Sequence, residues 1–238
     1  MKVAPALLIV AFATVAMLNL GRITEKVPFS VSRLDYVNTQ AKYQLLLLGV
    51  TFLVLAAIYF VNRENLFTFL APGDLAAPAG GIPWLGIPDK STWCGVAAGL
   101  SLFITLGTSL FVYLQFGISR DAWGQIIPYL PWILLFSITN AFSEEVVYRL
   151  GIIVPLYGTV NPAYIMLISA VAFGAPHLRG MPNGLVGALM AGFLGWLLAK
   201  AVIETHGLFW AWFIHFLQDI VIFSAFVLAA AAKSVSHS

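Results

Sequence analysis

The segment IPYLPWILLFSITNAFSEEVVYRLGIIVPLY, residues 127–157, decides the fold of this chain. About 20 consecutive apolar residues can cross the hydrocarbon core of a bilayer as a helix, and this segment is long enough to do so. Its charged side chains are Glu144, Glu145 and Arg149. Each charge at bilayer depth costs at least ~2.5–3.5 kcal/mol, so these groups need partners inside the protein. The segment therefore predicts a membrane-spanning helix that carries part of a polar site.

The composition of the whole chain agrees with this interpretation. Of 238 residues, 61% are hydrophobic and 9% are charged, whereas a soluble domain carries about 25% charged residues. The apolar residues fall in blocks of roughly 17–25, the length of a membrane-spanning helix. The sequence predicts an all-α fold, a polytopic transmembrane helical bundle of about seven spans (six to eight) with an intramembrane polar cavity.

The apolar blocks give the expected spans in order. They are residues 4–20, 43–61, 93–116, 127–157, 161–180, 185–202 and 208–231. The first block could be a signal peptide or a retained span, and we expect retention because the rest of the chain stays in the membrane. Small residues recur at every fourth position along two faces of the sixth block, which predicts close helix packing. These residues are Gly184, Ala188 and Gly192 on one face and Gly187, Ala191 and Gly195 on the other.

A Pro/Gly-rich connection divides the chain. The density of Pro and Gly in residues 63–92 argues against a long helix there. Its apolar pieces, residues 66–70 and 84–87, are expected to lie at the membrane interface. We expect residues 1–92 to hold the N-terminal transmembrane helices and this connection. Residues 93–238 would then form a transmembrane core that carries the polar motifs.

Charge and cysteine content exclude several classes of function. The net charge is +2 and the basic residues are scattered, so no run of Lys or Arg indicates a nucleic-acid partner. Cys94 is the only cysteine, which excludes an intrachain disulfide and a Cys-based metal site. We expect Cys94 to be buried as a small hydrophobe.

Three polar motifs interrupt the late apolar blocks. They are Ser143-Glu144-Glu145-Val146-Val147-Tyr148-Arg149, Phe173-Gly174-Ala175-Pro176-His177 and His215-Phe216-Leu217-Gln218-Asp219. Ionisable groups within transmembrane segments usually face the interior of the bundle and mark a functional site. The three motifs therefore predict one shared polar site, most simply that of an intramembrane enzyme.

The first motif assigns different tasks to two adjacent carboxylates. Glu145 and Arg149 lie four residues apart and share a helix face, so they can pair. Glu144 is rotated by about 100° from Glu145 and has no local cation, which suits it to act as a general base. Tyr148 lies one turn after Glu144 and could bond into the site or form its wall. The alternative is a structural Glu144 that caps or pairs with another helix.

The second motif predicts a locally opened helix. Phe173 and His177 are one turn apart, and Pro176 with the neighbouring Gly174 weakens the helix there. Irregular backbone at membrane depth is tolerated where it lines a cavity. We therefore expect His177 to face the polar site, although a satisfied structural histidine is the alternative.

The third motif brings an imidazole and a carboxylate to one helix face. His215 and Asp219 are four residues apart, and a carboxylate that accepts from imidazole fixes its tautomer. Glu144, His177 and His215 could bind Zn²⁺. The same groups could activate water without a metal, and we expect this second case. No cofactor is then required, a divalent metal such as zinc being the alternative.

Together these motifs resemble those of the CPBP intramembrane proteases. That family includes the type II CAAX prenyl endopeptidases and the bacterial Abi proteins linked to bacteriocin maturation or self-immunity. The resemblance rests on Glu-Glu-x-x-x-Arg, Phe-x-x-x-His and His-x-x-x-Asp in this order. It covers about residues 127–225, with a softer match at residues 84–87.

The resemblance implies a role for each motif position. Glu144 corresponds to the catalytic glutamate and His177 to its partner in activating water. Glu145 and Arg149 match supporting positions. His215 and Asp219 match the oxyanion-side pair. The family's third motif often ends in Asn, and because an ionised Asp cannot donate a hydrogen bond, we expect Asp219 to orient His215 instead.

The function expected from the sequence is hydrolysis of a peptide bond in a membrane-associated protein or peptide. Membrane lipid and that substrate are the expected partners, and a bacterial plasma membrane is the expected location. A non-catalytic membrane immunity or binding protein is the first alternative. A proton-coupled transporter is the second, since buried Glu and His also relay protons, although no internal repeat is apparent.

Overall fold

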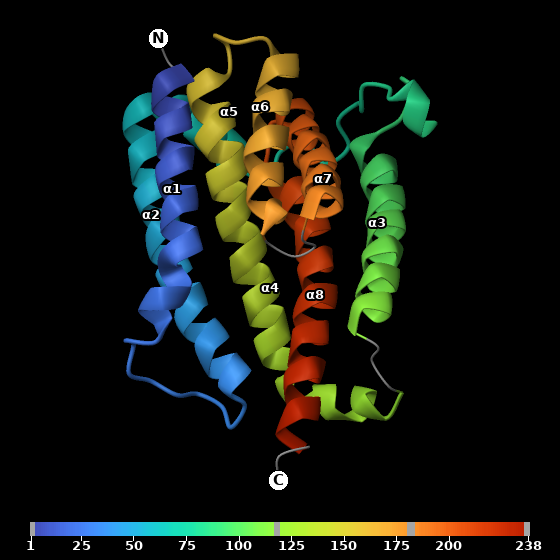
Figure 1. Ribbon diagram of the computed structural model, residues 1–238. Coiled ribbons are helices and arrows are strands. Elements are labelled where there is room, and N and C mark those ends of the chain that lie inside the picture. The colour runs from blue at the N-terminus through green and yellow to red at the C-terminus, as the bar shows by residue number, and fades with distance from the viewer. Residues whose placement is uncertain (1–2, 117–119, 180–183, 236–238) are drawn as a thin grey trace.

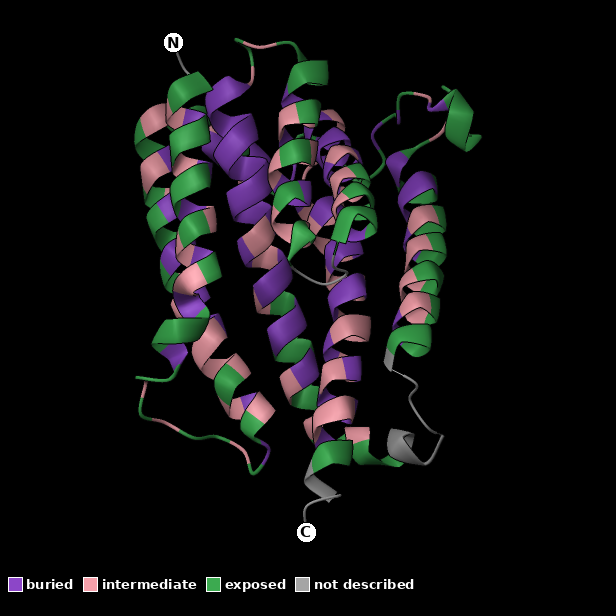
Figure 2. Ribbon diagram, viewed as in Figure 1, coloured by how far each residue is buried: buried purple, intermediate pink, exposed green. Residues whose placement is uncertain are grey.

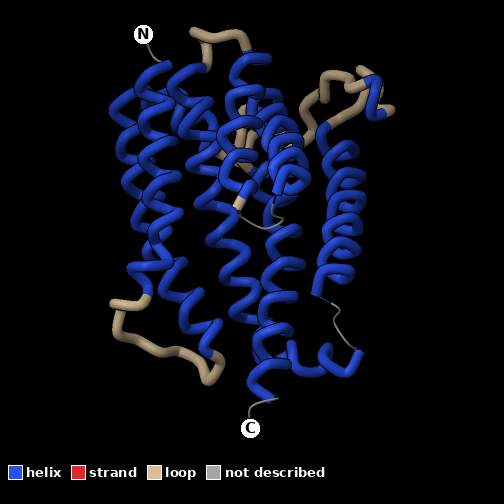
Figure 3. The backbone as a smooth tube through the Cα atoms, in the orientation of Figure 1, coloured by secondary structure: helices blue, strands red, loops and turns tan. Residues whose placement is uncertain are grey.

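The computed structural model describes residues 3–116, 120–179 and 184–235, and within them it is a helical bundle (Figure 1). The longer helices are α1 Val3–Thr24, α2 Asp35–Leu70, α3 Trp93–Phe116, α4 Leu130–Glu145, α5 Gly151–Leu156, α6 Pro162–Gly174, α7 Gly184–Thr205 and α8 Phe209–Val235. Short 3₁₀ turns occupy Pro83–Leu85, Arg120–Tyr129 and Ala175–Leu178, and a π-helical turn, Val146–Leu150, joins α4 to α5. No extended strand occurs in the described ranges, as Figure 3 shows. The predicted all-α class is confirmed.

Six helical segments of the described chain are long and apolar enough to cross a membrane. They are Val3–Thr24, Asp35–Leu70, Trp93–Gln115, Gly124–Leu156, Gly184–Thr205 and Phe209–Lys233. The chain is therefore an integral, multi-pass membrane protein. The predicted fifth span, residues 161–180, is a shorter apolar helix, Pro162–Leu178. Pro162 starts it and Pro176 disrupts its end, so α6 ends about half-way along the bundle in Figure 1. Its expected end near Gly180 and Pro182 lies outside the described residues.

The second helix is longer than its apolar block predicted. α2 continues past residue 61 to Leu70 across a kink at Asn62, whose φ and ψ are −162° and 86°. The Asn62 side chain accepts a hydrogen bond from the Asn65 backbone N–H at 3.2 Å, in the manner of an N-cap that restarts the helix. Residues 66–70 are thus helical rather than part of the connection, and Leu66 and Phe69 are buried.

The Pro/Gly-rich connection is confined to residues 71–92 and is fastened to the end of α7. Glu204 pairs with Lys200 and accepts hydrogen bonds from the Trp93 indole at 2.9 Å and the Gly80 backbone at 3.2 Å. Trp84 remains 68% exposed. The expectation that Cys94 is buried is wrong: it is exposed, because α3 buries only a narrow stripe of its surface.

The centre of the bundle is the continuous run from α4 through the π-helical turn to α5. Every residue from Glu145 to Leu156 is buried (Figure 2). α2 contacts all three parts of the run, and α8 packs against α4. α1 and α6 contact the π-helical turn and α5, and α7 contacts the turn. The segment that the sequence singled out is therefore the core about which the other helices are arranged.

The glycines of α7 permit a close crossing with α6. A Cβ added at Gly195 would lie 3.0 Å from the Cβ of Phe173 and 3.2 Å from both Ala170 Cα and the Ser169 carbonyl oxygen. These neighbours are mostly backbone or near-backbone atoms, so they cannot move aside easily. The packing predicted from the small-residue stripes is present, and it places Phe173 against α7.

We predict that Gly195→Val lowers the thermal stability of the purified protein. Overpacking costs about 1–3 kcal/mol, equivalent to roughly 2–10 °C in a protein of this size. Gly99→Val is the matched control, because a Cβ at that mid-helix position meets no atom within 4 Å. Thermal unfolding in detergent, followed by size-exclusion chromatography, measures both variants. Equal midpoints for the two would contradict the close-crossing interpretation.

Candidate active site

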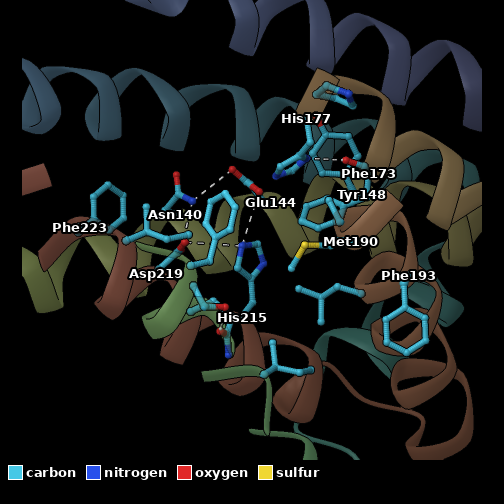
Figure 4. Close-up of a pocket in the computed structure, with 18 of the residues that line it drawn as sticks. Asn140, Glu144, Tyr148, Phe173, His177, Met190, Phe193, His215, Asp219 and Phe223 are labelled. Carbon is cyan, nitrogen blue, oxygen red and sulfur yellow. Dashed lines mark hydrogen bonds and ion pairs between the residues drawn. The ribbon is translucent and has the colours of Figure 1, made fainter. Parts of the chain in front are cut away.

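A cavity of about 510 Å³ opens between α1, α2, α3, α4, α6, α7 and α8. Its polar lining includes Asn140, Glu144, His177, His215, Gln218 and Asp219. Figure 4 shows Glu144, His215 and Asp219 between Phe223 on one side and Phe193 on the other. The rest of the lining is largely apolar and includes Met17, Phe103, Phe111, Met190, Phe193, Leu194 and Phe226. All three predicted motifs contribute to this polar lining, although Glu144 of the first motif and Asp219 of the third are 75 residues apart in the sequence.

A buried ion pair fixes the wall behind this cavity. Arg149 Nε lies 2.9 Å from Glu145 Oε2, and both side chains are fully buried. The guanidinium carbon of Arg149 is 4.2 Å from the centre of the Phe173 ring, an arrangement typical of a cation–π contact. Its Nη1 and Nη2 atoms have no hydrogen-bond partner in the described structure. The ring face therefore supplies the main contact on that side of the cation.

The π-helical turn begins directly after Glu145 and contains Arg149. Such a turn leaves carbonyl groups without their usual helical partners, and the Tyr148 carbonyl accepts a hydrogen bond from Ser169 Oγ at 2.9 Å. The Tyr148 hydroxyl accepts one from Thr14 at 3.2 Å. The first motif is thus held by α6 and α1 as well as by its own ion pair.

Glu144 faces away from Arg149 and into the cavity. Its Oε1 accepts a hydrogen bond from Asn140 Nδ2 at 3.2 Å. Its Oε2 lies 3.6 Å from His215 Nε2. The two adjacent glutamates therefore face different partners, as their rotation about the helix axis predicted.

His215 is oriented by a different carboxylate from the expected one. Its Nδ1 lies 2.8 Å from Glu145 Oε1, whereas its Nε2 is 3.8 Å from Asp219 Oδ1, beyond hydrogen-bonding distance. A carboxylate accepts, so Nδ1 carries the hydrogen and Nε2 points toward Glu144 and the cavity. Glu145 thus joins Arg149 to His215, a link across helices that local spacing does not reveal.

His177 follows the helix that Pro176 opens. The α6 helix changes to a 3₁₀ turn at Ala175–Leu178, as the second motif predicted. His177 Nδ1 lies 2.8 Å from the Phe173 carbonyl oxygen. Since a carbonyl only accepts, Nδ1 donates and Nε2 is left as an acceptor. In Figure 4 the His177 ring lies on the Glu144 side of the cavity.

Phe173 is the centre of the aromatic contacts in the site. The centroid of its ring lies 5.0 Å from that of His177, 5.6 Å from that of His215 and 5.4 Å from that of Tyr148. These spacings are typical of tilted and edge-to-face aromatic pairs. Phe173 therefore separates the buried ion pair from the cavity while keeping both imidazoles in fixed orientations.

A comparison with known families now identifies the segment that carries this site. The family of type II CAAX prenyl endopeptidases, Rce1-like, matches residues 126–221. Residues 126–221 are thus similar to the Rce1-like family. This Rce1-like segment contains every motif residue described above, and its family is one of endopeptidases. Comparison of the chain with curated proteins and with solved structures gives no match.

Glu144, His177 and His215, the three possible zinc ligands, all line the cavity. No three His, Cys, Asp or Glu side chains of the described chain are arranged to hold a metal ion together. The residues as arranged do not fit a metal centre, and no chemical step is assigned to one.

Two site residues were not anticipated from the sequence. Asn140 donates to Glu144 and also to Asp219 Oδ2 at 3.1 Å. Gln218 accepts from Thr108 at 2.8 Å and donates to Thr105 at 3.1 Å, which ties α3 to α8. The position of Asn140, four residues before Glu144, was an available signal because side chains four apart share a helix face.

We predict that Arg149→Met strongly destabilises the protein, because it leaves the Glu145 carboxylate buried beside a neutral side chain. Removal of one partner of a buried pair costs about 3–5 kcal/mol. The double variant Glu145→Gln with Arg149→Met removes both charges and should regain much of the lost folded yield. The yield of monodisperse protein in detergent measures this. A double variant no better than Arg149→Met would contradict the pairing as the cause.

Proposed function

We propose that this protein is a glutamate-dependent intramembrane endopeptidase of the CAAX prenyl protease type. The substrate is a membrane-associated protein or peptide, and the reaction is hydrolysis of one peptide bond. The observation that carries the proposal is the position of Glu144. Its carboxylate lines the cavity 3.6 Å from His215 Nε2 and forms no ion pair with a Lys or Arg of the described residues. It lies in a segment that matches an endopeptidase family.

In the proposed mechanism Glu144 acts as the general base. Water adds its oxygen to the scissile carbonyl carbon while its proton passes to Glu144, and His177 Nε2 accepts the water's other hydrogen bond. The carbonyl oxygen becomes an oxyanion. When the C–N bond breaks, Glu144 returns the proton to the leaving nitrogen, so that one water is consumed and an acid and an amine are released.

His215 serves the developing oxyanion in this scheme. Glu145 accepts from Nδ1 at 2.8 Å. In this scheme His215 reacts as the imidazolium, whose second hydrogen, on Nε2, is directed toward the cavity and can be donated to the oxyanion. Asp219, which accepts from Asn140, has no hydrogen to donate when it is ionised. In this scheme it stabilises the positive charge of the His215 ring, whose Nε2 lies 3.8 Å from Asp219 Oδ1. These roles follow from which atoms can donate and which can accept.

The composition of the cavity supports a membrane-associated substrate. A few polar side chains line one part of the cavity, and aromatic and aliphatic side chains of α1, α3, α7 and α8 line most of the remainder. Such a lining binds an apolar portion of a ligand while the few polar groups fix its orientation. A peptide carrying an apolar anchor could therefore bring a backbone carbonyl to Glu144 while its anchor fills the apolar part.

We predict that Glu144→Gln abolishes proteolysis while the protein stays folded. The general base contributes about 10²–10⁴-fold to the rate, so kcat should fall by about that factor. The assay uses protein in liposomes with a quenched fluorescent peptide bearing a farnesylated CAAX sequence, together with its unlipidated copy. Glu64→Gln is the matched control, because Glu64 is exposed and distant from the cavity.

A second measurement separates this function from binding alone. Membrane proteins that accumulate in cells expressing Glu144→Gln, but not Glu64→Gln, are identified by mass spectrometry and retested as substrates. Any cleavage by Glu144→Gln at the wild-type rate would exclude the proposed mechanism. A cellular phenotype that survives both Glu144→Gln and His177→Ala would instead indicate a non-catalytic immunity or binding protein.

A further inference from the structure

Asn140 bridges two carboxylates that lie on different helices. Its Nδ2 is 3.2 Å from Glu144 Oε1 and 3.1 Å from Asp219 Oδ2. The amide nitrogen has two hydrogens, so it can donate one to each carboxylate at the same time. Figure 4 shows Asn140 next to both of these side chains. Asn140 therefore links the first motif on α4 to the third motif on α8, in addition to the hydrogen bond between Glu145 and His215.

A hydrogen bond from Gln44 fixes the orientation of the Asn140 amide. Asn140 Oδ1 accepts a hydrogen bond from Gln44 Nε2 at 3.3 Å, and Gln44 Oε1 in turn accepts one from Thr139 at 2.8 Å. Rotating the Asn140 amide by 180° would turn its oxygen toward two carboxylate oxygens, which are acceptors as well. Asn140 and Gln44 are both buried, so an unmade bond would not be replaced by bulk water.

The bridge determines which oxygen of Glu144 is available for chemistry. With Oε1 held by Asn140, Oε2 is the atom nearest His215 Nε2, at 3.6 Å. Asp219 Oδ1 is 3.8 Å from the same nitrogen. Two carboxylates therefore face one imidazole nitrogen, and like charges at such separations repel each other. The two N–H groups of Asn140 each donate to one carboxylate and so hold Glu144 and Asp219 close together in spite of this repulsion.

We propose that Asn140, oriented by Gln44, is a positioning residue that holds Glu144 in the rotamer required of the general base. This inference rests on the proposed function for its kinetic consequence. Asn140 does not touch the reacting atoms. It restrains one oxygen of Glu144 and thereby directs the other toward the cavity, and it keeps Asp219 at a fixed distance from the same site.

The test compares Asn140→Leu with Gln44→Leu and with Asn19→Leu. Asn140→Leu keeps the approximate side-chain volume and removes both N–H donors to the carboxylates. Gln44→Leu keeps these donors and removes only the hydrogen bond that orients the Asn140 amide. Asn19→Leu makes the same chemical change in α1, where Asn19 bonds only locally, to Val15 and Arg22, outside the cavity lining. Loss of a hydrogen bond to a charged group predicts a fall in kcat of about 10- to 100-fold for Asn140→Leu. The KM of Asn140→Leu should stay within about two-fold of the wild-type value. The kcat of Gln44→Leu should fall by a smaller factor, and the kcat of Asn19→Leu should not fall.

A second readout does not depend on proteolysis. Dicyclohexylcarbodiimide is lipid-soluble and modifies carboxyl groups in their protonated form, and mass spectrometry measures its rate of reaction at Glu144. A Glu144 carboxylate without the Asn140 hydrogen bond should be modified several-fold faster, with Glu144→Gln giving the background. Unchanged kcat and unchanged labelling in Asn140→Leu would overturn the inference.

The two proposals can fail separately. If the wild-type protein shows no Glu144-dependent cleavage, the proposed function fails, and the labelling rates alone decide the role of Asn140. If Asn140→Leu does not fold, Gln44→Leu gives the same two readouts without touching either carboxylate. A loss of thermal stability in Gln44→Leu, with normal kcat and normal labelling, would show a purely structural amide and would also overturn the inference.

Discussion

The buried pair of Glu145 and Arg149 is the interaction on which the site depends. Both side chains are fully buried in the central helical run, where an unpaired charge would cost several kcal/mol. The pair also has contacts beyond its own helix. Glu145 uses its other oxygen to hold His215 on α8, and Arg149 packs against the ring of Phe173 on α6. One ion pair therefore sets the relative positions of the helices that carry the second and third motifs.

This arrangement explains why two adjacent glutamates can have different roles. The same backbone that turns Glu145 toward Arg149 turns Glu144 to the other side, because consecutive helical residues differ by about 100°. Glu145 is saturated by Arg149 and His215. Glu144 instead accepts a hydrogen bond from the Asn140 amide and lies 3.6 Å from His215 Nε2. The buried pair thus acts as a rigid support for the neighbouring Glu144, whose carboxylate lines the cavity.

Sequence reasoning was most successful where the relevant contacts are local. Composition and block length predicted a helical membrane bundle, and the four-residue spacing of Glu145 and Arg149 predicted their pair. Pro176 predicted the opened helix before His177. These features depend on the chain within about one helical turn, where the geometry is fixed.

Features that depend on distant segments could not be read in this way. The partner of His215 is Glu145 rather than Asp219, although His215 and Asp219 have the favourable local spacing. The length of α2 depends on a cap at Asn62, and hydropathy alone placed the end of that helix too early. Gln44, which lies 96 residues before Asn140, carries no local signal of its contact. Such pairings become visible only when the packing of helices is known.

The distribution of charge also favours base chemistry at this place in the cavity. Proton transfer from water to Glu144 removes a negative charge from the carboxylate while an oxyanion forms on the substrate nearby. The negative charge therefore moves a short distance instead of being created in a low-dielectric cavity, where an isolated charge is very costly. His215 Nε2 lies 3.6 Å from Glu144. A hydrogen on this nitrogen can stabilise the negative charge both on Glu144 and on the substrate oxyanion. Asn140 holds Glu144 and Glu145 holds His215. Because both side chains are already in position, little reorganisation has to accompany the reaction.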